Sequence, residues 1–343
     1  MLGVQFWILT SVWALACGHR LFAADATWSE DHRLLYAGIP VQVRFSPADT
    51  ALEGDIWRYL EGIDAAFNDY RDDSEIGIVN RAGVGDHRVS TELADAFSAG
   101  RAIGILTEGA FDLTVGPLRR VWREAERSGQ PATPAALTTA MQQVGPSTWS
   151  LEGSTLHVSK PGVKFDFGGL IKGMAVDHAL TMAITGGATA ALIQVGGETT
   201  CFGLSQHGEP HRLGIPDPDH PDNVLVRLQD PGTGLSGSTS ANYFNAIVIG
   251  GRPYYHIFDP RTGAPVETHV LSASVVFPRC GRNGLADGLC KGGVINGWDW
   301  LAKTVARLGG EAMIILRTAD GGKELKRTPG WSRLEIATES GTR

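Results

Sequence analysis

Four apolar runs constrain the fold of this chain more than any other feature of its sequence. They read ALIQV, AIVIG, SASVVF and AMIILR, at residues 191–195, 246–250, 272–277 and 312–317. Short apolar runs of this kind predict buried strands. Helical segments come between some of them, but without the regular alternation of a doubly wound parallel sheet. We therefore expect an α+β fold, a single layered domain with mixed or antiparallel sheets and packed helices.

The N-terminal half is expected to add one strand and two helices. VQVRF at 41–45 alternates apolar and polar residues, which is the period of a half-buried strand. Apolar residues at helical spacing predict a helix within 55–70, and Ser90 is a suitable N-cap for a second helix that breaks near Gly109. The polar, proline-containing stretch at 124–147 is interpreted as a surface insertion.

Charge and composition limit the classes of partner. The chain has 343 residues, 43% of them hydrophobic, which is ample for a sizeable core. Its formal net charge is −7, and no basic run is interleaved with aromatic residues in the way that a nucleic-acid backbone selects. We therefore expect no nucleic-acid partner.

The first 24 residues are interpreted as a signal peptide. An apolar run extends from Val4 to Cys17, too short for a membrane span and of the length of a signal-peptide core. ALAC at 14–17 also loosely resembles a lipoprotein box, which would leave the protein tethered to a membrane through a lipid on Cys17. The expectation is a periplasmic or otherwise exported protein, and the alternative is a buried N-terminal helix.

The four cysteines form neither a CxxC motif nor a zinc-binding spacing. Cys17 belongs to the signal segment, so three remain, and an odd number argues against a disulfide framework. One bridge, between Cys280 and Cys290, stays open as an alternative.

Two stretches carry polar residues that suit ligand binding. In FDFGGLIKGMAVDHAL, at 165–180, a glycine doublet precedes a helical segment, where free backbone N–H groups and Lys172 would attract an anion; Asp166 also suits a helix cap. The alternative is a purely structural corner. In YYHIFDPRTGAP, at 254–265, His256 comes just before a DPRTG turn and is either a general base or a hydrogen-bonded structural histidine.

LADGLCKGG, at 285–293, poses the question of a metal site. Mg²⁺ prefers oxygen ligands, and Asp287 would supply one in what reads as a glycine-rich turn at a buried helix start. Four residues on, however, stands Lys291, which cannot ligate a metal while it is protonated, and Cys290 is a soft ligand. From chemistry alone, an ion pair between Asp287 and Lys291 is the better interpretation.

Taken together, these stretches resemble the family of FAD:protein FMN transferases, the ApbE family. Seven motifs match in order along nearly the whole mature chain, over about 30–335. They are FNDYRDDSEIGIVNR (67–81), GAFDLTVGPL (109–118), DFGGLIKGMAVD (166–177), QVGGETTCFG (194–203), STSANY (238–243), HIFDPRTGAPV (256–266) and LADGLCKGG (285–293).

The resemblance implies a domain that binds FAD and a divalent metal, usually Mg²⁺. It implies transfer of FMN to a Ser or Thr of an exported acceptor protein, with release of AMP. It also implies roles for individual residues: His256 as the base, Asp287 and the Gly169 carbonyl as metal ligands, and a cofactor site that includes Tyr70, Ala110, Phe111, Asp112, Asp166, Lys172 and Phe258.

The chain departs from the family pattern inside the implied site. Lys291 replaces the threonine that binds the metal in the family, Cys290 is unusual on the metal side, and Ala241 replaces the glycine of STSG. An ammonium at position 291 would neutralise the diphosphate in place of the metal, which makes Lys291 a candidate catalytic residue. The alternatives are a flavin-binding carrier or chaperone, a relative that no longer transfers FMN, and an FAD pyrophosphatase.

Overall fold

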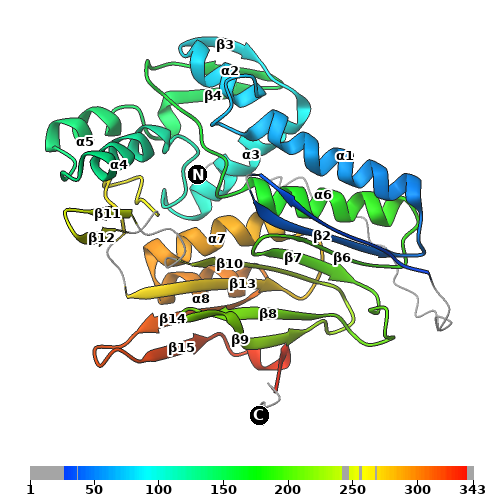
Figure 1. The fold of residues 1–343 in the computed structure, drawn as a ribbon. Helices are drawn as coiled ribbons and strands as arrows, with labels where there is room; N and C mark the ends of the chain where they lie inside the picture. Colours follow the sequence, from blue (N-terminus) through cyan, green and yellow to red (C-terminus); the bar gives the residue numbers. More distant parts are fainter. Residues whose placement is uncertain (1–26, 37, 242–246, 255–256, 267–268, 338–343) are drawn as a thin grey trace, which may run out of the picture.

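An eight-stranded antiparallel sheet forms the centre of the fold (Figure 1). The computed structural model describes residues 27–36, 38–241, 247–254, 257–266 and 269–337, so the predicted signal segment, Cys17 and His256 lie outside the described residues. In spatial order the strands are β1 (Ser29–Leu35), β2 (Ile39–Ser46), β6 (Ala190–Val195), β7 (Glu198–Phe202), β10 (Leu235–Ala241), β13 (Val270–Phe277), β14 (Glu311–Arg317) and β15 (Lys323–Arg327). The strands predicted at 41–45, 191–195, 272–277 and 312–317 are confirmed.

Helices cover one face of this sheet (Figure 1). They are α1 (Thr50–Phe67), α6 (Ile171–Thr185), α7 (Asn283–Asn296) and α8 (Trp298–Arg307). Val43 and Ile193 of the sheet pack into one core with Leu60 of α1, while Val275 packs into a second core with Leu289 of α7. The apolar spacing that predicts the helix within 55–70 is therefore the buried side of α1.

The other face of the sheet is covered in part by a three-stranded sheet. It consists of β8 (Arg212–Asp217), β9 (His220–Gln229) and β16 (Glu335–Ile336), in the order β16–β9–β8. Leu213 and Val226 of the small sheet pack against Met313 of the large one. With helices on one face and strands on the other, the layered α+β prediction is confirmed.

A histidine buried beside β8 makes the fold sensitive to acid. His211 is 4% exposed, and its Nε2 has no hydrogen-bond partner among the described residues. Burial lowers the pKa of His211 to about 4, because the charged imidazolium would lose its hydration. The unfolded chain therefore takes up a proton near pH 6.5, before the folded chain does, and stability falls as the pH falls from 6.5 to 4.

We predict that the His211→Gln variant lacks this acid-sensitive contribution. Between pH 7 and pH 4 the wild type should lose about 3 kcal/mol more unfolding free energy than the variant does. Urea denaturation at the two pH values measures both losses, and the other titrating groups cancel in the comparison. Equal losses would show that folding does not lower the pKa of His211.

Two helices and a small sheet lie at one end of the molecule (Figure 1). Helix α3 (Thr91–Leu106) begins where predicted, with Ser90 Oγ accepting a hydrogen bond from the Leu93 amide. Helix α2 (Glu75–Ala82) precedes the sheet of β3 (Gly85–Arg88), β5 (Thr155–Val158) and β4 (Trp149–Glu152), in the order β3–β5–β4.

The structure refines two predicted elements. The stretch at 124–147 lies mostly on the surface, but it is largely helical: it completes α4 (Gly116–Ser128) and forms α5 (Pro134–Met141), because Trp122 and Ala140 supply buried anchors that the polar composition obscures. The run at 246–250 contains a strand, as predicted, but this strand is only partly buried. It is β11 (Ile247–Ile249), which among the described residues pairs with β12 (Arg252–Tyr254) and leaves Val248 exposed.

LADGLCKGG is also corrected, because it lies within a helix and not in a turn. Asp287 is in the second turn of α7, and the glycines serve close packing. A Cβ at Gly288 would lie 2.5 Å from the Ile103 side chain, so glycine lets α7 press against α3. On the same helix Cys290 is a buried free thiol, so the alternative of a Cys280–Cys290 bridge is not formed.

Among the described residues, no helix has both the length and the apolar composition that crossing a bilayer requires.

Candidate active site

A group of four charged side chains lies where α6, α7 and β7 meet. We call Lys172, Glu198, Asp287 and Lys291 the charge cluster. Lys291 Nζ donates a hydrogen bond to Asp287 Oδ1, and Lys172 Nζ lies 3.6 Å from Asp287 Oδ2 and 3.4 Å from Glu198 Oε1. The cluster contains two cations and two anions, so its formal charge is zero.

The two carboxylates of the charge cluster are buried, while the two lysine side chains are partly exposed. Asp287 is 0% exposed and Glu198 2%, whereas the side chains of Lys172 and Lys291 are 23% and 19% exposed. Burial alone would lower the pKa of Lys172, but the charges of Asp287 and Glu198 outweigh it and raise that pKa. Both ammonium groups are thus held beside buried negative charge.

A capping contact between two helices explains how the charge cluster is positioned. Asp177 of α6 accepts hydrogen bonds from the backbone amides of Asn283 and Gly284, both at 2.9 Å, and so caps the start of α7. A Cβ at Gly173 would lie 2.4 Å from the Asn283 carbonyl oxygen, so the two helices approach as closely as only glycine permits. This contact places Lys172 beside Asp287.

Two further predicted site residues, Phe111 and Gly169, lie next to the charge cluster. A Cβ added at Gly169 would lie 3.1 Å from Phe111 Cε2 and 3.5 Å from Lys291 Cε. The glycine turn that precedes α6 is therefore close to both the Phe111 ring and the Lys291 side chain. The structure thus brings Phe111, Gly169, Lys172, Asp287 and Lys291 to one place, although the motifs that carry them are far apart in the sequence.

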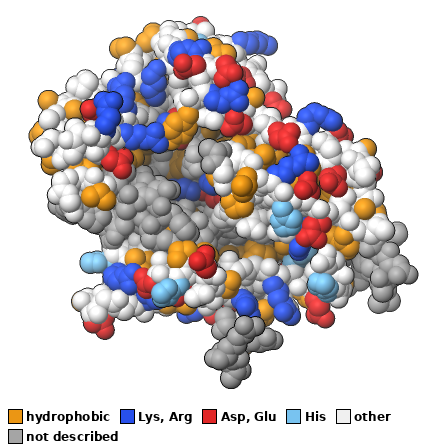
Figure 2. Space-filling model, in the orientation of Figure 1, with side chains coloured by type: hydrophobic (Ala, Val, Ile, Leu, Met, Phe, Trp, Pro, Cys, Tyr) orange, Lys and Arg blue, Asp and Glu red, His pale blue; other side chains and the backbone are white. Residues whose placement is uncertain are grey.

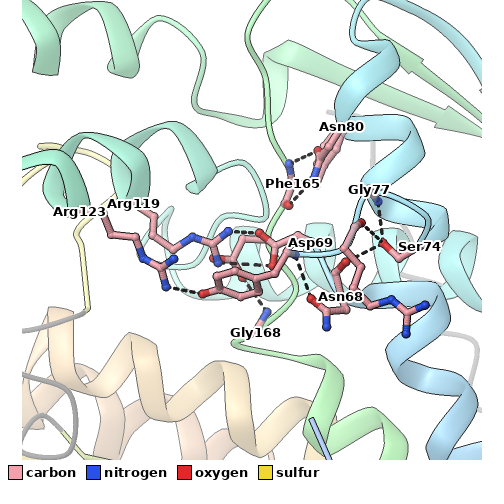
Figure 3. Close-up of polar contacts among 12 residues, drawn as sticks. Asn68, Asp69, Ser74, Gly77, Asn80, Arg119, Arg123, Phe165 and Gly168 are labelled. Atoms are coloured by element: carbon pink, nitrogen blue, oxygen red, sulfur yellow. Dashed lines mark hydrogen bonds and ion pairs between the residues drawn. The ribbon is translucent and has the colours of Figure 1, made fainter. Parts of the chain in front are cut away.

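Two further predicted residues are linked by an arginine (Figure 3). Arg119 of α4 binds Asp69 and Asp166 together, with 2.7 Å between its Nη1 and Asp166 Oδ2. The ring of Tyr70 lies between the guanidinium groups of Arg119 and Arg123, 4.7 and 4.8 Å away, and its hydroxyl accepts a hydrogen bond from Arg123 at 2.6 Å. Asp166 Oδ1 also accepts the amide of Gly168, so this network leads directly to the glycine turn.

The remaining predicted residues have local structural partners. Asp112 Oδ1 accepts the Thr114 amide at 2.7 Å, and burial raises the pKa of Asp112. Ala110 is buried in the turn that follows α3. Phe258 stacks on Trp122 of α4, with 6.3 Å between ring centroids, and contributes to the core beside β11. Their cofactor-binding roles stay predictions, as does the role of His256.

The charge cluster does not fit a divalent cation as it stands. Both oxygens of Asp287 face ammonium groups, and position 291 offers no oxygen ligand. Burial raises the pKa of Cys290 to about 12, which keeps its sulfur a thiol, and this thiol donates to the Ser238 carbonyl. No set of three or more acidic, histidine or cysteine side chains suited to a metal occurs in the described part of the chain. A metal on Asp287 and Gly169 would require Lys291 to withdraw.

Three side chains of the candidate site were not predicted from the sequence. Glu198 follows the Gly196–Gly197 turn in the motif quoted above, and Asp177 ends another motif. Both are acidic residues in otherwise apolar stretches, a pattern that indicates a buried carboxylate with a specific partner. Arg119 gave no such signal, because it is one of several charged residues in GPLRRVWREAER.

Comparison with known proteins agrees with the fold and the motifs. The model of the ApbE family matches residues 37–314, and the chain belongs to this family. An FAD:protein FMN transferase of Vibrio cholerae is 29% identical over 276 residues, which are 80% of this chain and 81% of the relative, and one of Salmonella typhimurium is 28% identical over 79% of each chain. The structure of the flavin transferase ApbE from Vibrio cholerae superposes with a TM-score of 0.76 at 26% identity, covering 90% of this chain and 99% of that one.

Proposed function

We propose that this protein is a flavin transferase that binds FAD and transfers its FMN moiety to a Ser or Thr of an acceptor protein. The observation that carries the proposal is the charge cluster. In a chain of this family, two partly exposed lysine side chains pair with buried carboxylates, and one of them, Lys291, lies next to Gly169, which also adjoins the Phe111 ring. Cations fixed in this way stabilise the negative charge that develops when a pyrophosphate is cleaved.

The proposed chemistry is a displacement at phosphorus. The oxygen of the acceptor hydroxyl forms a bond to the FMN phosphorus, the bond from this phosphorus to the bridging oxygen breaks, and AMP leaves with that oxygen. The hydroxyl proton goes to a base, for which His256 is the candidate. Lys172 and Lys291 would lie against the diphosphate oxygens, and Asp287 and Glu198 would hold both ammonium groups in place.

A transfer assay tests the proposal directly. Purified protein is incubated with FAD and a peptide that carries the acceptor motif D-x-x-[ST]-[GA]-[AS]-[ST], which the family resemblance implies. We expect a fluorescent peptide band in a denaturing gel and one AMP released for each flavin transferred. Release of AMP and free FMN without a band would instead identify an FAD pyrophosphatase.

One observation favours a second candidate, a flavin carrier without a transfer step. Lys291 pairs with Asp287 and so takes up the carboxylate to which the family resemblance assigns the metal. A carrier would bind FAD tightly in the presence of EDTA and would release no AMP. Detection of AMP in the transfer assay rules this candidate out.

We also propose that the protein acts outside the cytoplasm. The proposal is supported by the apolar run from Val4 to Cys17, which has the length of a signal-peptide core. Cell fractionation of the full chain and of a Cys17→Ser variant distinguishes a lipid-tethered form from a released one.

A further inference from the structure

An arginine-rich cleft is lined in part by Tyr70. It has a volume of about 470 Å³ and is lined by α2, α4 and the segment before Phe165. Six cationic side chains line it, against three carboxylates. Figure 2 shows Lys and Arg side chains gathered over this end of the molecule, around α2 and α4. The cleft therefore has an excess of positive charge in a chain whose net charge is −7.

Three of these cations are not neutralised within the described part of the chain. Arg119 pairs with Asp69, Arg81 with Asp72, and Arg127 with Glu124. By contrast, Arg120, Arg123 and Lys164 form no ion pair with a described carboxylate: the Arg123 guanidinium binds the Tyr70 hydroxyl, and Lys164 Nζ donates to the Asn80 carbonyl. Burial lowers the pKa of Lys164, and the charges of Arg120 and Arg81 lower it further, which reflects an uncompensated positive potential.

The spacing of the arginines matches a linear ligand. Arg120, Arg123 and Arg127 lie on one face of α4, at intervals of three and four residues, which spreads them over roughly 10 Å of the helix axis. An extended peptide spans that length with about four residues, and its alternate side chains repeat at about the pitch of one helical turn. Guanidinium groups pair well with carboxylates in this arrangement. A single phosphate would engage only one end of the row.

We propose that this cleft docks an acidic segment of the acceptor protein. The inference rests on the proposed function, since it assigns the cleft to the substrate of that reaction. Tyr70 belongs to the cleft lining, and Arg119 connects the cleft to Asp166 and the glycine turn. A segment bound along α4 is thereby held next to the site where its neighbouring hydroxyl reacts. The net charge of the whole chain is −7, so an acidic partner is repelled by most of the surface and attracted to this cleft.

Fluorescence anisotropy with a rhodamine-labelled hexaglutamate peptide tests the cleft without any transfer reaction. We expect salt-sensitive binding, weakened roughly tenfold or more in the double variant Arg120→Glu/Arg127→Glu, because two attractive contacts become repulsive. The matched control is Lys303→Glu/Arg307→Glu, two exposed cations on α8 with Arg307 also in the last helical turn. This control should bind hexaglutamate as the wild type does. The milder Arg120→Gln/Arg127→Gln variant should lie in between.

A second measurement connects the cleft to function. For two peptides with the same acceptor motif, one preceded by four glutamates and one by four serines, the glutamate peptide should have the lower KM. The Arg120→Glu/Arg127→Glu variant should remove this difference without changing kcat or FAD affinity. Unchanged hexaglutamate binding in this variant, or tighter binding of a labelled dT12 oligonucleotide than of hexaglutamate, would overturn the proposal. If the wild type binds hexaglutamate but transfers no flavin to either peptide, the result counts against the proposed function and not against the cleft as a binding site for acidic peptides.

Discussion

Replacing Asp287 by alanine is expected to lower the free energy of unfolding by about 3 kcal/mol. Asp287 is fully buried and lies against the ammonium groups of Lys172 and Lys291. Its removal leaves two cations facing only Glu198, and an uncompensated charge in a desolvated place is costly. Thermal or urea denaturation monitored by circular dichroism measures the loss.

Two variants separate this charge effect from the loss of packing. Asp287→Ala/Lys291→Met removes one cation together with the anion and should regain a large part of the lost stability. Asp219→Ala removes a carboxylate that pairs with Arg317 and Lys323 at the surface, where its side chain is 34% exposed, and should cost less than about 1 kcal/mol. If Asp287→Ala costs no more than Asp219→Ala, the ammonium groups are solvated and the charge cluster contributes little to stability.

Periodicity was sufficient to predict the parts of the fold that bury apolar residues regularly. The strands at 191–195 and 312–317 and the helix within 55–70 were found in this way, because each depends on local pattern. The helices within 124–147 were missed, since they are held by a few anchors such as Trp122 and are otherwise polar. The run at 246–250 does contain a strand, but Val248 is exposed, because an apolar run does not reveal which element will cover it.

The candidate site shows the same limit. The four-residue spacing of Asp287 and Lys291 was enough to predict their ion pair, because both are on one face of one helix. That Lys172 and Glu198 join them depends on how α6, α7 and β7 pack, which no local spacing encodes. The glycines of LADGLCKGG indicate a turn, whereas in the structure they allow close contacts with other elements, such as that of Gly288 with Ile103 of α3, which lie outside the motif.

Lys291→Thr is expected to create a divalent-cation site that the wild type lacks. With Lys291 the charge cluster is neutral, and without it the cluster carries one net negative charge, since Lys172 alone faces Asp287 and Glu198. In the variant Asp287 Oδ1 loses its ammonium partner, and Glu198 Oε2 has no hydrogen-bond partner among the described residues, so two buried oxygens are available. A threonine hydroxyl would add a third oxygen on the same face of α7, and Mg²⁺ and Mn²⁺ prefer such ligands.

Electron paramagnetic resonance of added Mn²⁺ measures this gain, because bound Mn²⁺ loses the signal of the free ion. Lys291→Thr should bind one Mn²⁺ per chain at least about tenfold more tightly than the wild type, in keeping with the removal of one repelling charge and the gain of one ligand. Lys291→Met removes the charge without supplying an oxygen, and its affinity for Mn²⁺ should fall between those of the other two proteins.

In the wild type, EDTA should leave flavin transfer unchanged. The positive charge beside the diphosphate comes from Lys172 and Lys291, which a chelator cannot remove. Stoichiometric Mn²⁺ in the wild type would instead show that Lys291 leaves Asp287 when a metal is present, and the ion pair would then be a resting arrangement of an ordinary metal site.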